Sequence, residues 1–291
     1  MTTDDVPDAG RKPRDDEMDF YGLTDRGKVR PTNEDHFLFC QLKKQMQILA
    51  TSLPDAEPIS IGEERLAAFG MVADGVGGGA GGAEASRLAV EALTRYVSES
   101  IHTYYTADTT HRDQFAEALR KSALKAHQHL LKQAEANPAL QGMATTLTLA
   151  IGVWPMLYVV QVGDSRYYLL RGDELTQISR DQTVGQELVD SGAIDEVTAS
   201  KLKWSSTLSR SIGGSESHPV VTPVRNDWGY VHLLCSDGLT KHVSDEQIRR
   251  RLMEMTSAQD ACEKLVADAL EDGGTDNVTV IVVKGTRKDD D

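Results

Sequence analysis

The stretch TLTLAIGVWPMLYVVQVGDSRYYLL, residues 146–170, decides the fold. It is largely apolar, but Gly152, Pro155 and Gln161 interrupt it before it reaches the ~20 apolar residues that a membrane span needs. Three short strands are expected instead, at 144–152, 156–163 and 166–171. Trp154-Pro155 marks the first of the short connections between them, and connections of this length join antiparallel strands. The sequence therefore predicts antiparallel sheet and no membrane span.

The remainder of the chain alternates strand and helix patterns. Apolar runs bounded by turn residues predict further strands at 19–25, 36–42, 45–50, 65–73, 174–178, 219–224, 230–235 and 277–284. Apolar residues at helical spacing predict helices at 83–105 and 112–134 and near 257–270. Hairpin-sized gaps between strands and two consecutive helices favour an α+β fold, in which helices cover two sheets.

Composition and charge restrict the classes of function. The 291 residues, 40% of them hydrophobic, suffice for one large or two small domains. A formal net charge of −14 argues against a nucleic-acid partner, which requires a basic face. Cys40, Cys235 and Cys262 form no CxxC pair, so we expect reduced thiols in a cytoplasmic protein.

Both ends of the chain are polar. Residues 1–17 are charged and contain no apolar core of the kind that signal peptides have, so we expect a disordered tail there. A shorter tail is expected at 287–291, which leaves residues 18–286 as the folded domain. No membrane partner is expected.

A run of glycines lies in VADGVGGGAGG, residues 72–82. It matches the dinucleotide-binding pattern GxGxxG at Gly77, Gly79 and Gly82, which would suit a nucleotide-dependent oxidoreductase. That pattern requires a second strand soon after the helix. Here a second helix follows, and no strand is expected for about 40 residues. The nucleotide site is therefore the weaker hypothesis, and Asp74, just before the glycines, becomes the residue of interest.

Acidic residues mark the edges of several predicted strands. They are Asp74, Asp164 and Asp237, which follow apolar strands, and Asp276 and Glu34-Asp35, which precede them. A single aspartate at such a place is usually a turn former. Five edges with the same arrangement suggest convergence, and converging carboxylates repel one another unless a cation holds them. Oxygen ligands alone select Mg²⁺ or Mn²⁺.

Two such ions can share one bridging carboxylate and one water, which they acidify while they stabilise charge on a phosphoryl group. Asp74 is the candidate bridge. Gly75 has no Cβ, so an ion or its waters can approach the backbone there.

Six runs of sequence, taken together, are typical of one family. They are TDRGKVRPTNED (24–35), VADGVGG (72–78), GMATTLTLAI (142–151), VGDSRYYLL (162–170), LCSDGLT (234–240) and GGTDNVTVIVV (273–283). In these runs, which span about residues 19–284, the chain resembles the metal-dependent protein phosphatases, the type 2C serine/threonine phosphatases, in their bacterial form. The resemblance implies a four-layer α-β-β-α sandwich with a two-metal centre at one edge of the sheets.

The resemblance also implies a role for each acid. Asp74 is expected to bridge both ions, and Gly75 to lend its carbonyl oxygen to one of them. Asp237 and Asp276 are expected to bind the other ion directly. Asp164, together with Asp237, is expected to hold a third and weaker ion.

Other residues of the motifs are implied to act around the ions. Glu34, Asp35 and Asn277 are expected to contact metal-bound waters, and Asp35 to act as the base on the attacking water. Arg30 is expected to bind the phosphate of the substrate, because a guanidinium fork fits two phosphate oxygens.

Three further features follow from the resemblance. Val76 stands where many eukaryotic members have a histidine proposed to protonate the leaving alcohol, so the general acid is unassigned, and a metal-bound water is our hypothesis for it. Arg166 is expected to be structural, tying down its turn. Residues 179–215 stand in the place of the family's mobile flap, which leans over the site.

The expected activity is the hydrolysis of phosphoserine and phosphothreonine on proteins by a monomer that opposes a serine/threonine kinase, with Mg²⁺ or Mn²⁺ as cofactor. Two alternatives within the family stay open. One is a phosphatase of a sigma-factor regulatory partner. The other is a pseudophosphatase that only binds phosphoproteins, although a binding module has no need of the intact set of acids.

Overall fold

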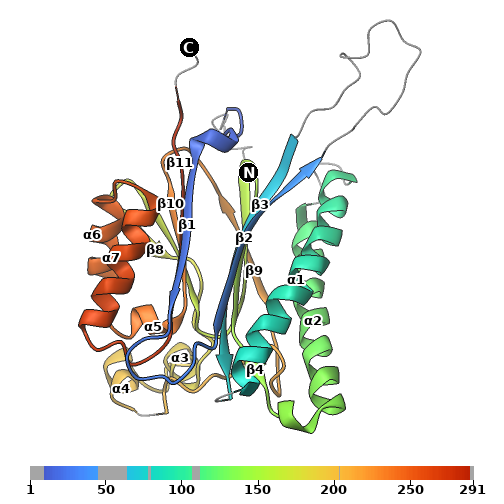
Figure 1. Cartoon of the computed structure of the whole chain (residues 1–291), viewed down its shortest axis with the longest axis vertical. Helices are drawn as coiled ribbons and strands as arrows, with labels where there is room; N and C mark the ends of the chain where they lie inside the picture. The colour runs from blue at the N-terminus through green and yellow to red at the C-terminus, as the bar shows by residue number, and fades with distance from the viewer. Residues whose placement is uncertain (1–9, 45–63, 78–79, 107–111, 203, 289–291) are drawn as a thin grey trace, which may run out of the picture.

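Two antiparallel sheets face each other, and helices cover both outer faces (Figure 1). The structure, a computed structural model, describes residues 10–44, 64–77, 80–106, 112–202 and 204–288. The first sheet has the order β1 (Met18–Asp25), β11 (Val278–Gly285), β10 (Val231–Cys235), β7 (Arg166–Arg171), β8 (Glu174–Gln177). The second has the order β2 (Asp35–Lys44), β3 (Glu64–Val76), β5 (Leu147–Val153), β6 (Met156–Val162), β9 (Val220–Arg225), and the short β4 (Ala144–Thr145) pairs with the end of β3.

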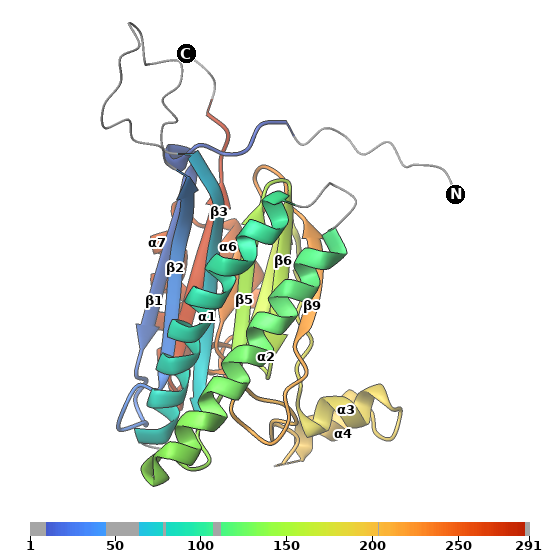
Figure 2. The same ribbon diagram turned by 90° about the vertical axis from the view of Figure 1, so that its right-hand side faces the viewer.

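The longer helices form the outer layers. α1 (Ala80–Thr106) and α2 (Arg112–Ala136) lie side by side on the second sheet (Figure 2), and α6 (Asp245–Met253) and α7 (Ala258–Glu271) lie on the first. The short helices α3 (Val184–Asp190), α4 (Glu196–Lys201) and α5 (Asp237–Thr240) lie at the lower end of the sandwich in Figure 1. Within the described residues, no helix is long and apolar enough to cross a membrane. The predicted four-layer α-β-β-α sandwich is confirmed.

The stretch 146–170 forms the expected hairpin and then changes sheet. β5 and β6 pair from Leu147 opposite Val162 to Val153 opposite Met156. β7, however, pairs with β8 and β10 in the other sheet. Residues 163–165 therefore cross from one sheet to the other, which places Asp164 at the seam between them.

Each pair of neighbouring layers encloses its own apolar core. Phe69 and Met71 of β3 pack with Leu93 of α1 between the second sheet and its helices. Val72, on the other face of β3, packs between the two sheets, and Leu265 of α7 belongs to the third core. Strands buried on both faces have near-continuous apolar sequences, which is why β3, β5 and β6 could be recognised without alternation.

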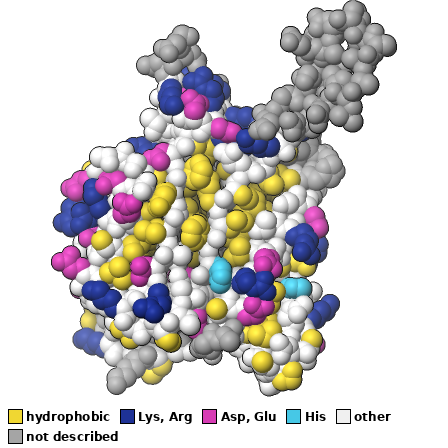
Figure 3. Space-filling view, in the orientation of Figure 1, with side chains coloured by type: hydrophobic (Ala, Val, Ile, Leu, Met, Phe, Trp, Pro, Cys, Tyr) yellow, Lys and Arg dark blue, Asp and Glu magenta, His cyan; other side chains and the backbone are white. Residues whose placement is uncertain are grey.

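One side of the sandwich is closed by aromatic side chains. β1 and β2 are edge strands of their sheets, and Phe20 of β1 stacks on Phe39 of β2 with 4.4 Å between the ring centroids. Hydrophobic side chains are visible between the two sheets on this side (Figure 3). The side chain of Phe20 is 45% exposed, so the ring covers the core between the sheets on one face and contacts solvent on the other.

Most predicted elements are present, with shifts at their ends. The helix expected at 83–105 begins at Ala80, and the helix expected near 257–270 is α7. α6 was not predicted, because most of its residues are polar and only Ile248 and Leu252 are buried. The reciprocal bonds between Ser244 and Gln247 at its start are a capping box, a sequence signal that could have revealed it. The strand expected at 45–50 lies outside the described residues.

The predicted boundary of the N-terminal tail at residue 17 was wrong. Residues 10–17 pack onto the domain, because Arg65 of β3 donates to the carboxylate of Asp15 at 2.7 Å and both Pro13 and Glu17 are buried. Residues 1–9 lie outside the described part of the chain. At the other end, the backbone N–H of Lys288 donates to Glu17 at 3.0 Å, so the described part of the predicted C-terminal tail is held as well.

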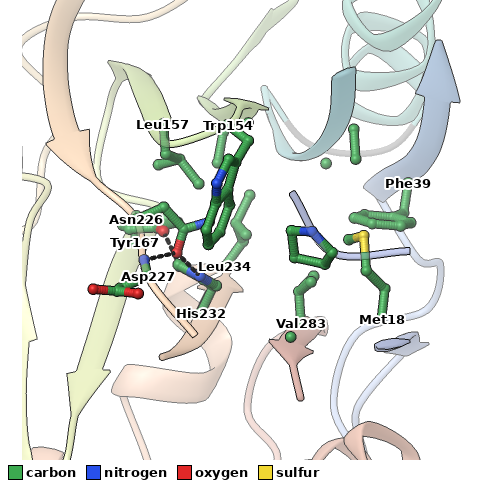
Figure 4. Close-up of a pocket in the computed structure, with 16 residues that line it drawn as sticks. Met18, Phe39, Trp154, Leu157, Tyr167, Asn226, Asp227, His232, Leu234 and Val283 are labelled. Carbon is green, nitrogen blue, oxygen red and sulfur yellow. Dashed lines mark hydrogen bonds between the residues drawn. The ribbon is translucent and has the colours of Figure 1, made fainter. Parts of the chain in front are cut away.

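A small cavity lies between the sheets at the end remote from Asp74 (Figure 4). Its floor is made by residues with no side chain beyond Cβ, since Ala68 pairs with Gly152 and Gly70 with Ala150. Figure 4 shows Trp154, Leu157 and Leu234 around it. His232 bonds Tyr167 at 2.6 Å and Asn226 at 3.1 Å, and burial lowers the pKa of its imidazole to about 4, so the ring is neutral.

Replacing Gly152 by alanine is expected to stabilise the protein. A Cβ added there would have the carbonyl oxygen of Ala68, at 3.7 Å, as its nearest neighbour and would extend into the cavity. Alanine also restricts the unfolded chain more than glycine does. We expect the free energy of unfolding, measured with urea, to rise by about 0.5–1 kcal/mol.

Gly22→Ala is the contrasting variant. A Cβ on Gly22 would lie 2.4 Å from the ring of Phe37, so the ring must move within a packed core. We expect a loss of about 1–3 kcal/mol. If both variants shifted the free energy of unfolding in the same direction, this account of the packing between the sheets would be wrong.

Candidate metal centre

A cleft at the lower end of the sandwich in Figure 1 brings the predicted residues together. It lies where β3 ends, where the chain crosses between sheets after β6, where α5 follows β10 and where β11 begins. All the predicted site residues except Asp35 line the cleft, namely Arg30, Glu34, Asp74, Gly75, Asp164, Asp237, Asp276 and Asn277. Asp35 is buried beside it, directly opposite Asp74 in the pairing of β2 with β3. The convergence expected from the strand edges is therefore present.

The glycines after Asp74 allow two backbones to touch. The N–H of Gly75 donates to the carbonyl of Glu34 at 3.2 Å. A Cβ on Gly75 would lie 2.2 Å from the carbonyl oxygen of Gly82, and a Cβ on Gly82 would lie 2.4 Å from the carboxylate of Glu34. The start of α1 is thus packed against the end of β3. All strand pairs are antiparallel in the described residues, so the βαβ unit that a dinucleotide site needs is absent there.

Threonines from the 142–151 run hold the backbone of Asp74. The hydroxyl of Thr145 and the N–H of Thr146 donate to the carbonyl oxygen of Asp74 at 2.8 and 2.9 Å. The N–H of Asp74 donates to the Thr146 hydroxyl at 3.0 Å, and that hydroxyl lies 2.6 Å from the hydroxyl of Ser165. The main chain beside Asp74 and Asp164 is therefore fixed by one network, and sequence analysis missed both threonines.

Asp35 connects the two sheets at this end. Its Oδ2 accepts hydrogen bonds from Ser236 at 2.8 Å and Thr279 at 2.7 Å, both in or next to strands of the other sheet. Its Oδ1 is buried and has no hydrogen-bond partner among the described residues. Burial, reinforced by the charges of Asp237 and Asp276, raises the pKa of Asp35 to about 6 despite the two hydroxyl bonds.

The carboxylates repel one another. Burial and the neighbouring Asp35 and Asp237 raise the pKa of Asp74 well above its ordinary value. Burial and Asp237 raise the pKa of Asp164 to about 8. Ionising these carboxyl groups together is unfavourable unless a cation joins them, which is the condition for binding one.

Two cationic side chains reach into the cleft. Arg30 grips Asp276 with its fork, with Nε 2.7 Å from Oδ1 and the terminal nitrogen 2.8 Å from Oδ2. Nζ of Lys241 lies 2.6 Å from Asp237 Oδ2 and 2.7 Å from Asp276 Oδ2. Burial alone would raise the pKa of Asp276, but these ion pairs outweigh it and lower that pKa. Sequence analysis missed Lys241, although its spacing of four from Asp237 was a usable signal.

Asn277 positions the loop that carries Arg30. Its amide oxygen accepts from the N–H of Glu34 at 2.8 Å, and its amide nitrogen donates to the carbonyls of Arg26 and Thr32 at 2.8 and 3.0 Å. The structure thus gives Asn277 a clear positioning role, and its implied contact with waters stays a prediction.

The flap region borders the cleft. α3 and α4 lie within the predicted flap, and Ser206, Thr207, Leu208 and Ser211 contribute to the wall of the cleft. A second groove runs between the flap and Asp164, Asp237 and Lys241. Arg166 makes a double ion pair with Asp181 at the start of the flap, so its predicted structural role is confirmed.

The donor set fits a hard divalent cation. The converging side chains offer oxygen atoms only, and Oδ1 of Asp35 and of Asp237 are buried without a hydrogen-bond partner among the described residues. As these side chains stand, no three acidic, histidine or cysteine groups of the described residues form a cage that is ready to hold an ion. Arg30 pairs with Asp276, and Lys241 pairs with both Asp237 and Asp276. These ion pairs explain why the acids lie close together without pointing their oxygens at one common position.

Known proteins share this sequence and fold. A serine/threonine protein phosphatase of Mycobacterium tuberculosis, PstP, is 36% identical over 263 residues, which are 90% of this chain and 44% of the relative. The serine/threonine phosphatase stp of Listeria innocua is 31% identical over 264 residues, covering 90% of this chain and 93% of the relative. A crystal structure of the Mycobacterium tuberculosis phosphatase superposes with a TM-score of 0.71 at 33% identity, covering 93% of this chain and 99% of that one.

Another crystal structure, of the PstP catalytic domain in complex with two manganese ions, has a TM-score of 0.69 and is 32% identical, with 93% and 99% of the two chains covered. The family model of protein phosphatase 2C matches residues 55–272. With this match, these relatives and the acidic cleft at the end of a four-layer sandwich, the chain belongs to the protein phosphatase 2C family.

Proposed function

We propose that the chain is a metal-dependent phosphatase that hydrolyses phosphoserine and phosphothreonine on proteins, opposing a serine/threonine kinase. The observation that carries this proposal is the gathering of strand-end carboxylates beside the guanidinium of Arg30 in one cleft. Relatives named as serine/threonine phosphatases support it. Because the chain spans 44% of the length of the Mycobacterium tuberculosis relative, the activity of that whole protein is carried over only as part of this proposal.

The proposed cofactor is Mg²⁺ or Mn²⁺, in two sites with a third weaker one. Asp74 and the carbonyl of Gly75 would hold one ion, Asp237 and Asp276 together with Asp74 the other, and Asp164 with Asp237 the third. Bound there, such ions would supply an acidified water and positive charge to neutralise the phosphoryl oxygens. The PstP catalytic domain solved with two manganese ions supports the choice.

The chain's own groups position the reactants. Arg30 binds two phosphoryl oxygens with its fork, in place of the two oxygens of Asp276 that it grips here. Asp35, with its free Oδ1 beside Asp74, accepts the proton of the attacking water. Val76 is 38% exposed at the cleft and has no proton to donate to the leaving alcohol.

The proposed partners are phosphorylated proteins that bind between the cleft and the flap. We propose a cytoplasmic monomer with no nucleic-acid partner. The unbridged cysteines support the cytoplasmic location. The net charge of −14 supports the absence of a nucleic-acid partner.

Asp74→Asn is expected to abolish turnover. The change keeps the shape of the side chain and removes the charge that the two ions would share. We expect kcat on a phosphothreonine peptide with Mn²⁺ to fall at least about 100-fold, and EDTA to abolish the activity of the unchanged protein. Thermal unfolding is the control for folding, since removing one of several repelling charges leaves the fold intact. Activity that survived either treatment would contradict the metal-dependent mechanism.

Arg30→Ala is expected to weaken substrate binding. A guanidinium that donates two charge-assisted hydrogen bonds contributes about 1.5–3 kcal/mol, so we expect kcat/KM for the phosphopeptide to fall about 10–100-fold. Arg30→Lys keeps the charge but loses the fork, so its kcat/KM should lie between those of the unchanged protein and Arg30→Ala. The matched control is Lys28→Ala, which removes one positive charge from the same exposed loop. If Lys28→Ala reduced kcat/KM as strongly, the effect would be one of general charge and not of a phosphate fork.

A further inference from the structure

Lys241 occupies a place that the proposed mechanism gives to a metal ion. It directly follows α5, one helical turn after Asp237, and its side chain bends back into the cleft. Its Nζ lies between two carboxylates, 2.6 Å from Asp237 Oδ2 and 2.7 Å from Asp276 Oδ2. These are the two acids that the proposed function assigns to one ion, so the ammonium and the ion seek the same oxygen atoms.

The ammonium satisfies this site only in part. Oδ1 of Asp237 stays buried without a hydrogen-bond partner among the described residues, and the neighbouring Asp74 and Asp164 receive no ion pair from Lys241 within 4.0 Å. A divalent ion carries twice the charge and takes about six oxygen ligands, so it can use the oxygens that the lysine leaves unpaired. Since Nζ lies at hydrogen-bond distance from Oδ2 of both carboxylates, an ion that binds these two oxygen atoms must displace it.

The displaced side chain has a polar place to go. Lys241 also lines the groove between the centre and the flap, together with Asp181, Thr183 and Glu196. Its side chain is 38% exposed even in the paired position, so it need not cross the core to leave. Moving it therefore replaces one polar environment by another and leaves the packed layers undisturbed.

We propose that Lys241 is a tethered competitor for the metal ion at Asp237 and Asp276: its ammonium holds the two carboxylates together in the metal-free protein and must move away before the ion binds. This inference rests on the proposed function for the identity of the site. Two consequences follow. Lys241 lowers the affinity of the site for Mn²⁺ or Mg²⁺, so that activity requires a higher concentration of free metal, and it stabilises the metal-free protein.

The test is the affinity for Mn²⁺ alone, without substrate, in the full chain. Calorimetric titration should show that Lys241→Met binds Mn²⁺ about tenfold or more tightly than the unchanged protein, because the ion no longer displaces a paired cation. In the presence of a chelator the melting temperature of Lys241→Met should be lower, and the rise on adding Mn²⁺ should be larger. Lys241→Arg keeps the charge and should bind Mn²⁺ with nearly unchanged affinity.

The matched control is Lys264→Met. Lys264 pairs with Asp260, four residues earlier on α7, at 2.8 Å, and its side chain is 41% exposed, so it has the same spacing from its acid and a similar exposure outside the cleft. It should leave Mn²⁺ affinity unchanged. If Lys241→Met does not fold, Lys241→Gln carries the same measurement with a polar side chain.

The outcomes separate this inference from the function on which it rests. Equal or weaker Mn²⁺ binding by Lys241→Met, with binding by the unchanged protein intact, overturns the competitor and leaves the phosphatase standing. An equal loss of melting temperature with and without Mn²⁺ also overturns it, because a purely structural ion pair behaves in that way. Failure of the unchanged protein to bind Mn²⁺ overturns both the metal centre and the inference.

Discussion

Mutual repulsion between carboxylates at the seam of the two sheets is the constraint around which this end of the molecule is built. Asp35 and Asp74 face each other across neighbouring strands of one sheet, while Asp237 and Asp276 approach from the other. Burial and this crowding raise the pKa of Asp35, Asp74 and Asp164 together. Such an arrangement persists only if the surrounding fold is rigid enough to hold like charges in place, and the apolar cores on both sides of each sheet provide that rigidity.

Asp74 is fixed through its backbone, which leaves its carboxylate available. Thr145 and Thr146 bond the main chain of Asp74, and Asn277 clamps the loop before Asp35 by three hydrogen bonds. Gly75 and Gly82 let the start of α1 approach the end of β3 to a distance that any Cβ would prevent. Close packing beside Asp74 therefore explains Gly75 and Gly82 of the glycine run that resembles a nucleotide fingerprint.

Features with a local cause were predictable from the sequence. The hairpin in 146–170 was found because its turn residues interrupt an apolar run, and the acids were found because each stands where such a run begins or ends. Features with a distant cause were not. The crossing of residues 163–165 to the other sheet, the bond of Glu17 to Lys288 and the position of Lys241 all depend on partners far away in the sequence or in another layer. α6 was not predicted because Ile248 and Leu252 are its only buried residues, too few to give a helical pattern of apolar residues.

The two cations at Asp276 also impose an order on binding. In the structure, Arg30 grips both oxygens of Asp276 and Lys241 shares one of them, so the carboxylate is fully engaged by side chains. A guanidinium fork can serve one oxyanion at a time, and the phosphate that Arg30 is proposed to bind competes with Asp276 for it. An ion bound to Asp276 would compete with both cations, so it would free Arg30 and displace Lys241. On these proposals metal binding precedes and promotes phosphate binding, because the same carboxylate holds both cations until the ion replaces them.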